Sequence, residues 1–131
     1  MKSGQNDSFQ EVVEDVLIRH RSVLDVVSKL QECSAKVNRA TMKSVTSCGC
    51  LQINATRQVL PEDASFLSWK TYTQTHLTGE LCPRCREILE TEIGQAMFYT
   101  AALCNLLNLD LNEIIEKEQE RVNALGPYSL A

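Results

Sequence analysis

The sequence feature that most constrains the fold is the stretch Leu81–Leu109, where a Cys-Pro-Arg-Cys knuckle leads into the longest apolar-periodic segment of the chain. Apolar residues recur in this segment at steps of three and four, and beyond the knuckle only Gly94 interrupts them. Such spacing predicts an amphipathic helix. Pro83 suits the first turn of that helix, because its missing N–H would have no partner there in any case. The sequence therefore predicts a long helix that begins at a pair of cysteines.

Helical spacing continues on both sides of this segment. Two capping boxes, in which side chains satisfy free backbone N–H groups, predict helix starts at Ser8–Glu11 and at Asp110–Glu113. The apolar stripe after the first box fits one long helix or two abutting helices, the second capped by Ser22. His20 lies on this stripe, which predicts a buried histidine. From 46 to 85 the spacing is irregular, and so long a connection needs something else to organise it.

The expected fold class is all-α, with one domain over residues 1–131 built as a bundle of about four to five helices and an irregular insert at 46–85. Aromatic residues make up 5% of the chain and β-branched runs are scarce, which disfavours an all-β sandwich. A net charge of −4 disfavours direct binding of nucleic acid. No apolar run is long enough for a membrane span, and the N-terminal residues lack the apolar core of a signal peptide. We therefore expect a cytoplasmic protein without a membrane partner.

Four of the six cysteines form a C-x-C pair and a C-x-x-C pair separated by 31 residues, at Cys48, Cys50, Cys82 and Cys85. In a reducing compartment these cysteines are not expected to form disulfides. Two short-range thiolate pairs match the closed tetrahedral geometry of structural zinc, which would clip the insert to the start of the long helix. The alternatives are a redox dithiol at a helix N-terminus and ordinary reduced cysteines. Cys33 and Cys104 lie on apolar stripes, which predicts small core residues.

Two segments carry a resemblance to a known family. Residues 92–115 read EIGQAMFYTAALCNLLNLDLNEII, and residues 29–37 read KLQECSAKV. They resemble the third helix with its following turn, and an earlier acidic helix, of the MazG-like all-α nucleoside triphosphate pyrophosphohydrolases. The matching positions are Glu32, which corresponds to the family's first acidic ligand, and Glu92, Gly94, Phe98, Leu107 and Asp110. The resemblance covers residues 23–45 and 86–122 and leaves the cysteine insert outside it.

This resemblance implies a MazG-like helical bundle that pairs into a homodimer and binds a nucleotide. It also implies Mg²⁺ held by carboxylates from two helices, with Glu32 and Glu92 as the candidate catalytic residues. Mg²⁺ in such a site would neutralise phosphate charge and generate the attacking hydroxide. Near the C-terminus, Gln119 and Arg121 would take the family's positions that face the substrate phosphates.

The chain departs from the family at the positions that should bind the metal. Gln95 stands where the family has a metal-binding Asp, and Cys33 and Lys36 replace two acidic positions that follow Glu32. The four positions 32, 36, 92 and 95 therefore change from four carboxylates, a charge of −4, to two carboxylates and one ammonium, a charge of −1. An ammonium group cannot coordinate a cation. Lys36 is therefore expected to be a built-in counter-charge between Glu32 and Glu92, the alternative being an ordinary solvated helix face.

These departures predict that the standard Mg²⁺-dependent activity has been lost. The chain would then be a nucleotide- or protein-binding regulatory module stabilised by structural Zn²⁺, with Lys36, Gln95, Gln119 and Arg121 as the candidate nucleotide-contacting positions. The alternative is an active nucleoside triphosphate pyrophosphohydrolase in which altered ligands still hold Mg²⁺. A third class is a zinc-bearing regulatory protein that reaches nucleic acid through a partner.

Overall fold

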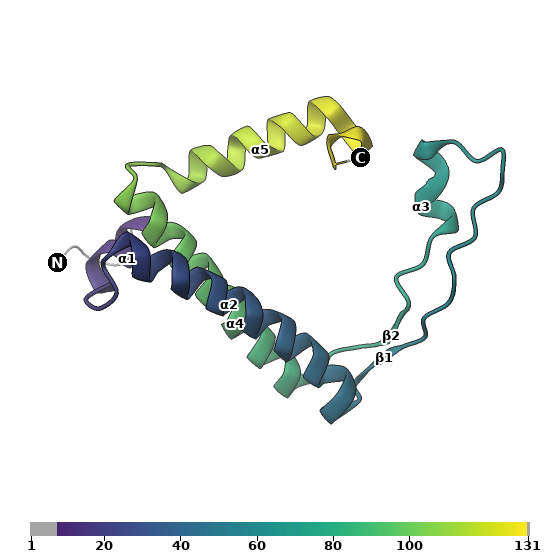
Figure 1. The fold of residues 1–131 in the computed structure, drawn as a ribbon, viewed down its shortest axis with the longest axis horizontal. Coiled ribbons are helices and arrows are strands. Elements are labelled where there is room, and N and C mark those ends of the chain that lie inside the picture. Colours follow the sequence, from purple (N-terminus) through teal and green to yellow (C-terminus); the bar gives the residue numbers. More distant parts are fainter. Residues whose placement is uncertain (1–7, 131) are drawn as a thin grey trace.

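The computed structural model describes residues 8–130, which form five α-helices, a two-stranded sheet and short helical turns. The body is an antiparallel pair of long helices, α2 (Val23–Lys43) and α4 (Pro83–Leu106), which lie side by side (Figure 1). Helix α1 (Phe9–Val16) packs against α4 at one end of this pair. The predicted mostly helical class is confirmed. Among residues 8–130, no helix is both long and apolar enough to cross a lipid bilayer.

The first helical stretch is two helices rather than one. Helix α1 ends at Val16, and α2 begins after Ser22, whose hydroxyl accepts the N–H of Leu24, so the predicted cap at Ser22 is confirmed. Between the helices, His20 adopts a left-handed backbone conformation with a φ of 57°, which a continuous helix does not allow. The prediction of a buried His20 is wrong. Its side chain is exposed and Nδ1 lies 4.0 Å from Asp25, because the break takes this residue off the apolar stripe.

The core lies where α1, α2 and α4 meet. Its buried side chains are Val13, Leu17, Val26, Ala101 and Ala102. Cys33 and Cys104 are also buried, as their places on the apolar stripes predicted. Toward the insert, the buried apolar side chains are Leu51 and Leu89. That end of the helix pair therefore has little apolar packing of its own.

The insert leaves α2 through a π-helical turn (Ser44–Cys48) and returns to α4 through a short antiparallel ribbon of β1 (Leu51–Ile53) and β2 (Leu77–Gly79). Gly79 pairs with Leu51 at a φ of 85°, and a Cβ there would collide with the carbonyl oxygen of the residue before β1. Position 79 therefore needs a glycine.

Beyond the ribbon, the insert forms an arm that extends away from the body (Figure 1). Its tip is a 3₁₀ turn (Phe66–Ser68) that continues into the one-turn helix α3 (Trp69–Tyr72). Phe66 stacks edge-on against Trp69, with 5.1 Å between ring centroids. The ring of Phe66 also lies 5.1 Å from that of Tyr128, so the tip of the arm contacts the C-terminal end of the chain.

Helix α5 (Leu111–Leu125) leads away from the body and is followed by a 3₁₀ turn (Gly126–Leu130) (Figure 1). The carboxylate of Asp110 accepts the N–H groups of Asn112 and Glu113, so the predicted cap at Asp110 is confirmed.

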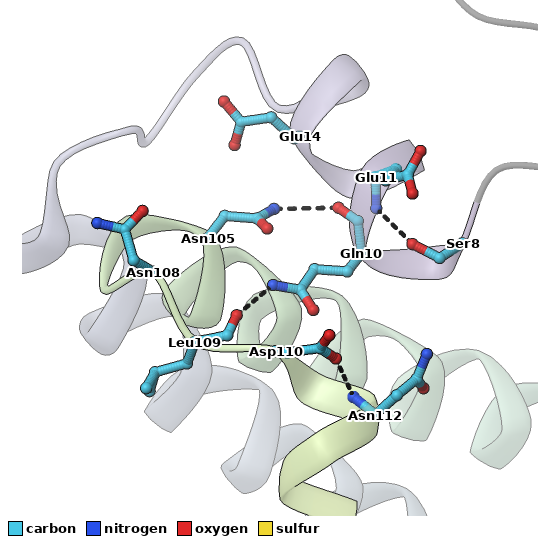
Figure 2. Close-up of a pocket in the computed structure, with 9 residues that line it drawn as sticks. All are labelled: Ser8, Gln10, Glu11, Glu14, Asn105, Asn108, Leu109, Asp110 and Asn112. Carbon is cyan, nitrogen blue, oxygen red and sulfur yellow. Dashed lines mark hydrogen bonds between the residues drawn. The ribbon is translucent and has the colours of Figure 1, made fainter.

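Gln10 of α1 holds the turn before α5. Its side-chain amide donates to the carbonyl of Leu109 at 2.6 Å (Figure 2) and accepts the N–H of Leu111 at 2.8 Å. The backbone carbonyl of Gln10 also accepts a hydrogen bond from the side chain of Asn105 at 3.0 Å. These three bonds fix the direction in which α5 leaves the body.

Candidate functional site

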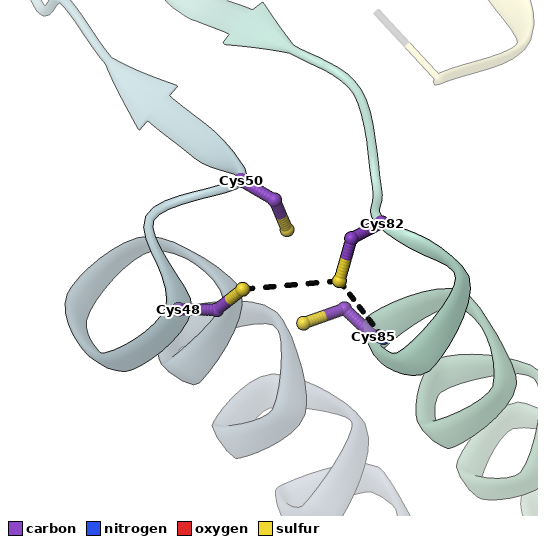
Figure 3. Close-up of side chains that lie close together, drawn as sticks. All are labelled: Cys48, Cys50, Cys82 and Cys85. Carbon is purple, nitrogen blue, oxygen red and sulfur yellow. Dashed lines mark hydrogen bonds between the residues drawn. The ribbon is translucent and has the colours of Figure 1, made fainter.

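Four thiols converge where the insert meets the long helices. Cys48 ends the π-helical turn, and Cys50 follows it across Gly49, whose left-handed backbone (φ 79°) turns the chain. Cys82 is the residue immediately before α4, and Cys85 lies in the first turn of that helix. The four sulfur atoms point toward one another (Figure 3). The structure thus brings together the four cysteines that the spacing predicted.

The distances between these thiols fit a tetrahedral metal site. All four sulfur atoms lie within 4.8 Å of one another, and those of Cys48 and Cys82 are 3.8 Å apart. Metal–sulfur bonds of about 2.3 Å, as zinc makes, place the sulfur atoms of a tetrahedron about 3.8 Å apart. None of the six cysteines forms a disulfide. The cluster can therefore hold a metal ion with four sulfur ligands.

The thiols of this cluster ionise unequally. The backbone N–H of Cys85 donates to the sulfur of Cys82 at 3.4 Å, and this bond, with contacts to the other thiols, lowers the pKa of Cys82 to about 7. A contact with Ser44 lowers the pKa of Cys85, but partial burial and the neighbouring thiols outweigh it and raise that pKa to about 12. Adjacent thiolates repel one another, so the site needs a cation before all four can be deprotonated together.

The predicted carboxylates lie on facing helices. Glu32 accepts Lys29 at 3.2 Å and Lys36 at 3.3 Å, both from α2. Lys29 and then Lys36 lower the pKa of Glu32, while Glu32, and more weakly Glu92 of α4, raise the pKa of Lys36. Lys36 thus pairs with Glu32 and lines one hollow together with Glu92. Among the described residues, Oε2 of Glu92 is buried without a hydrogen-bond partner.

The remaining family positions lie elsewhere. Gln95 lines a separate hollow between α4 and Phe9 of α1. Gln119 and Arg121 are exposed on α5, where Arg121 forms a two-pronged ion pair with Glu118 of the same helix. The structure therefore does not bring Gln119 and Arg121 to the two glutamates, and Gln95, one turn after Glu92 on α4, lines a different hollow.

One side of the α2–α4 pair carries a groove, here called the apolar groove, that has no charged lining. It has a volume of about 630 Å³ and is lined by Val27, Leu30, Gln31, Ser34, Val37, Ile93 and Ala96. Val27 and Ile93 are 43% and 46% exposed, so large apolar side chains meet solvent here. Positions 23, 27, 30, 34 and 37 of α2 follow alternating steps of four and three, the spacing of a coiled-coil seam.

Another side of the pair carries a second groove, here called the basic groove. It has a volume of about 310 Å³ and is lined by Lys36, Arg39, Ala40, Lys43, Ile88 and Glu92. Sequence reasoning did not single out Arg39 and Lys43. Their spacing could have identified them. Cations at positions 36, 39 and 43 are separated by steps of three and four, which place them on one side of a helix.

No family model matches the chain, and it has no match among curated proteins or solved structures. The resemblance to the MazG-like pyrophosphohydrolases therefore rests on the sequence segments 29–37 and 92–115 and stays a prediction.

Proposed function

We propose that this chain is a degenerate MazG-like module that binds a ligand or partner and does not hydrolyse nucleotides. The observation that carries this proposal is the position of Lys36, whose Nζ lies 3.3 Å from Glu32. Mg²⁺ requires hard oxygen ligands in a near-octahedral array. The ammonium group of Lys36 pairs with the carboxylate of Glu32 and repels a Mg²⁺ ion that approaches it. The neutral Gln95, in its separate hollow, supplies no replacement carboxylate.

The four-cysteine cluster, in this proposal, holds a structural Zn²⁺. Support comes from the four sulfur atoms within 4.8 Å and from a ligand set made only of thiols, which is typical of closed zinc sites. The ion would join the π-helical turn to the first turn of α4, at the end of the body where the buried apolar side chains of the described residues are Leu51 and Leu89. A reducing compartment such as the cytoplasm would keep these cysteines available as ligands.

The module is further proposed to be a homodimer that pairs through the apolar groove. The groove has no charged lining residue, and the α2 positions on that side have the spacing with which helices interdigitate. Two copies related by a two-fold axis would bring the same surface together, burying Val27 and Ile93 of both chains. The four long helices would then form one bundle.

The second candidate is an active nucleoside triphosphate pyrophosphohydrolase with altered ligands, and one observation favours it. Oε2 of Glu92 is buried without a partner among the described residues. A buried polar atom without a hydrogen bond is unusual and is often satisfied by an ion or a water. A metal held by Glu92 and by carboxylates from a second copy would meet that need.

Turnover separates the two candidates. The zinc-loaded protein is incubated with mixed nucleoside triphosphates and Mg²⁺ or Mn²⁺, and released pyrophosphate is measured. The proposal expects no turnover above that of the Glu92→Ala variant. Turnover that this substitution abolishes would refute the non-catalytic function and establish the hydrolase.

A further inference from the structure

We propose that the basic groove binds a phosphate-chain anion directly, without a divalent cation. This inference rests on the proposed function in one respect, the loss of the Mg²⁺ site. The ligand class is a small molecule that carries two or three linked phosphates, either free or attached to an organic group. Three cations of α2 and the apolar side chain of Ile88 on α4 provide the recognition.

The groove carries positive charge that is not fully paired. The groove is lined by three cations and one carboxylate, so its local charge is +2 in a chain whose net charge is −4. Lys36 is paired with Glu32. Arg39 and Lys43 form no ion pair with any residue in the part of the chain that the structure describes. An anion entering the groove therefore meets two cations that need not first release a partner.

The three cations of the groove follow one another along a single side of α2. Lys36, Arg39 and Lys43 occupy steps of three and four along α2, so they span about 10 Å at 1.5 Å per residue. A chain of three linked phosphates is somewhat shorter than this span, and the flexible lysine side chains can reach inward to its oxygens. The guanidinium of Arg39 offers a planar fork that matches two oxygens of one phosphate, while the two ammonium groups act as point charges on either side.

The size and the lining of the groove suit a small molecule. A volume of about 310 Å³ lies at the lower end of the range for small-molecule sites. Ile88 and Ala40 add apolar surface beside the cations, where an organic group attached to the phosphates would lie. The carboxylate of Glu92 also lines the groove and opposes an anion, and the three cations outweigh it.

Magnesium is unnecessary in this arrangement and is disfavoured by it. The role of Mg²⁺ in nucleotide sites is to neutralise phosphate charge, and here ammonium and guanidinium groups do so. One of the two carboxylates that would hold the metal is engaged instead, since Glu32 accepts two lysines. The groove should thus bind the metal-free anion at least as well as its Mg²⁺ complex.

Calorimetric titration of the full-length, zinc-loaded protein tests this inference. The probes are inorganic tripolyphosphate, ATP and the carboxylate analogue tricarballylate, in magnesium-free buffer without chelator so that the zinc cluster stays intact. The double variant Arg39→Gln/Lys43→Gln is compared with Lys70→Gln/Lys117→Gln, which removes the same number of charges from α3 and α5. We expect tripolyphosphate or ATP to bind the wild type and the control, and the groove variant to bind at least about tenfold more weakly.

The titrations decide whether the basic groove binds a phosphate-chain anion and which part of the ligand it contacts. Tighter binding of ATP than of tripolyphosphate would show that the apolar surface contacts an organic group of the ligand. Equal binding of the two would show that the groove recognises the phosphate chain alone. Absence of binding, equal binding by both double variants, dependence on added Mg²⁺, or equally tight binding of tricarballylate would overturn the inference. Pyrophosphate release in the turnover assay would instead refute the proposed function, so the two failures are distinguishable.

Discussion

The side-chain nitrogen of Lys36 lies 3.3 Å from one carboxylate oxygen of Glu32, and that of Lys29 lies 3.2 Å from the other. Both carboxylate oxygens of Glu32, the residue at the family's first acidic position, therefore pair with lysines of α2. These contacts hold the pKa of Glu32 below its usual value and raise that of Lys36, so both groups stay charged around neutral pH. A metal ion at this carboxylate would lie beside two ammonium groups, which repel it.

Replacing that ammonium should create a cation site. The substitution Lys36→Glu releases one oxygen of Glu32 and adds a third carboxylate near Glu92, giving a cluster of hard oxygen donors. We expect this variant to bind Mn²⁺ with a dissociation constant of about 1 mM or below, measured by calorimetry or by the Mn²⁺ resonance signal. The control is Lys43→Glu, which makes the same charge change further along α2. Equal Mn²⁺ binding by wild type, variant and control would contradict the counter-charge role of Lys36.

The thiol cluster predicts a second result, on zinc content. Freshly purified protein should carry about one zinc per chain by elemental analysis, since four thiolates complete a tetrahedral shell. The substitution Cys48→Ser removes one ligand and should weaken zinc binding by at least about 100-fold. Cys33→Ala is the matched control because Cys33 is buried in the helix pair, away from the cluster. That variant should lose stability but keep its zinc, and the same zinc content in both variants would argue against a four-cysteine site.

The lowered pKa of Cys82 predicts a distinct pH profile in the metal-free protein. The thiolate is the form that iodoacetamide alkylates, and a lowered pKa moves thiolate formation to lower pH. Alkylation of Cys82 should therefore rise with pH through a midpoint of about 7, instead of the ordinary 9.0, and added zinc should suppress it. Peptide mass spectrometry gives the rate, with Cys82→Ser as the blank. A midpoint near 9.0 would show that the N–H of Cys85 does not stabilise this thiolate.

Local rules were enough to predict the helices and the thiol cluster. Caps at Ser22 and Asp110 set helix starts through bonds to residues two or three positions away, which a sequence displays directly. The cysteine cluster could also be predicted from the sequence, because the two cysteines of each pair are close in sequence and both pairs border the insert. Short spacing decides the caps and the members of each cysteine pair, and the β1–β2 ribbon brings together the two pairs that lie 31 residues apart.

Other features depend on packing between distant segments. The hydrogen bond from Gln10 to Leu109 joins residues 99 positions apart, and nothing in either local sequence marks the other partner. The strands β1 and β2 contain three residues each, too few for an alternating pattern to stand out. The two grooves require the rotation of α2 against α4, which spacing within one helix does not determine.

The apolar groove leads to the last prediction, on oligomeric state. Val27 lies in this groove with 43% of its surface exposed, and a homodimer that pairs there would bury it. Burying the carboxylate of a Val27→Glu variant without a partner is costly, so this variant should be monomeric by light scattering where the wild type is dimeric. Leu24→Glu is the control, because Leu24 is 73% exposed on α2 and does not line the groove. A monomeric wild type would remove the homodimer from the proposal. A dimer that survives Val27→Glu would place the interface on another surface.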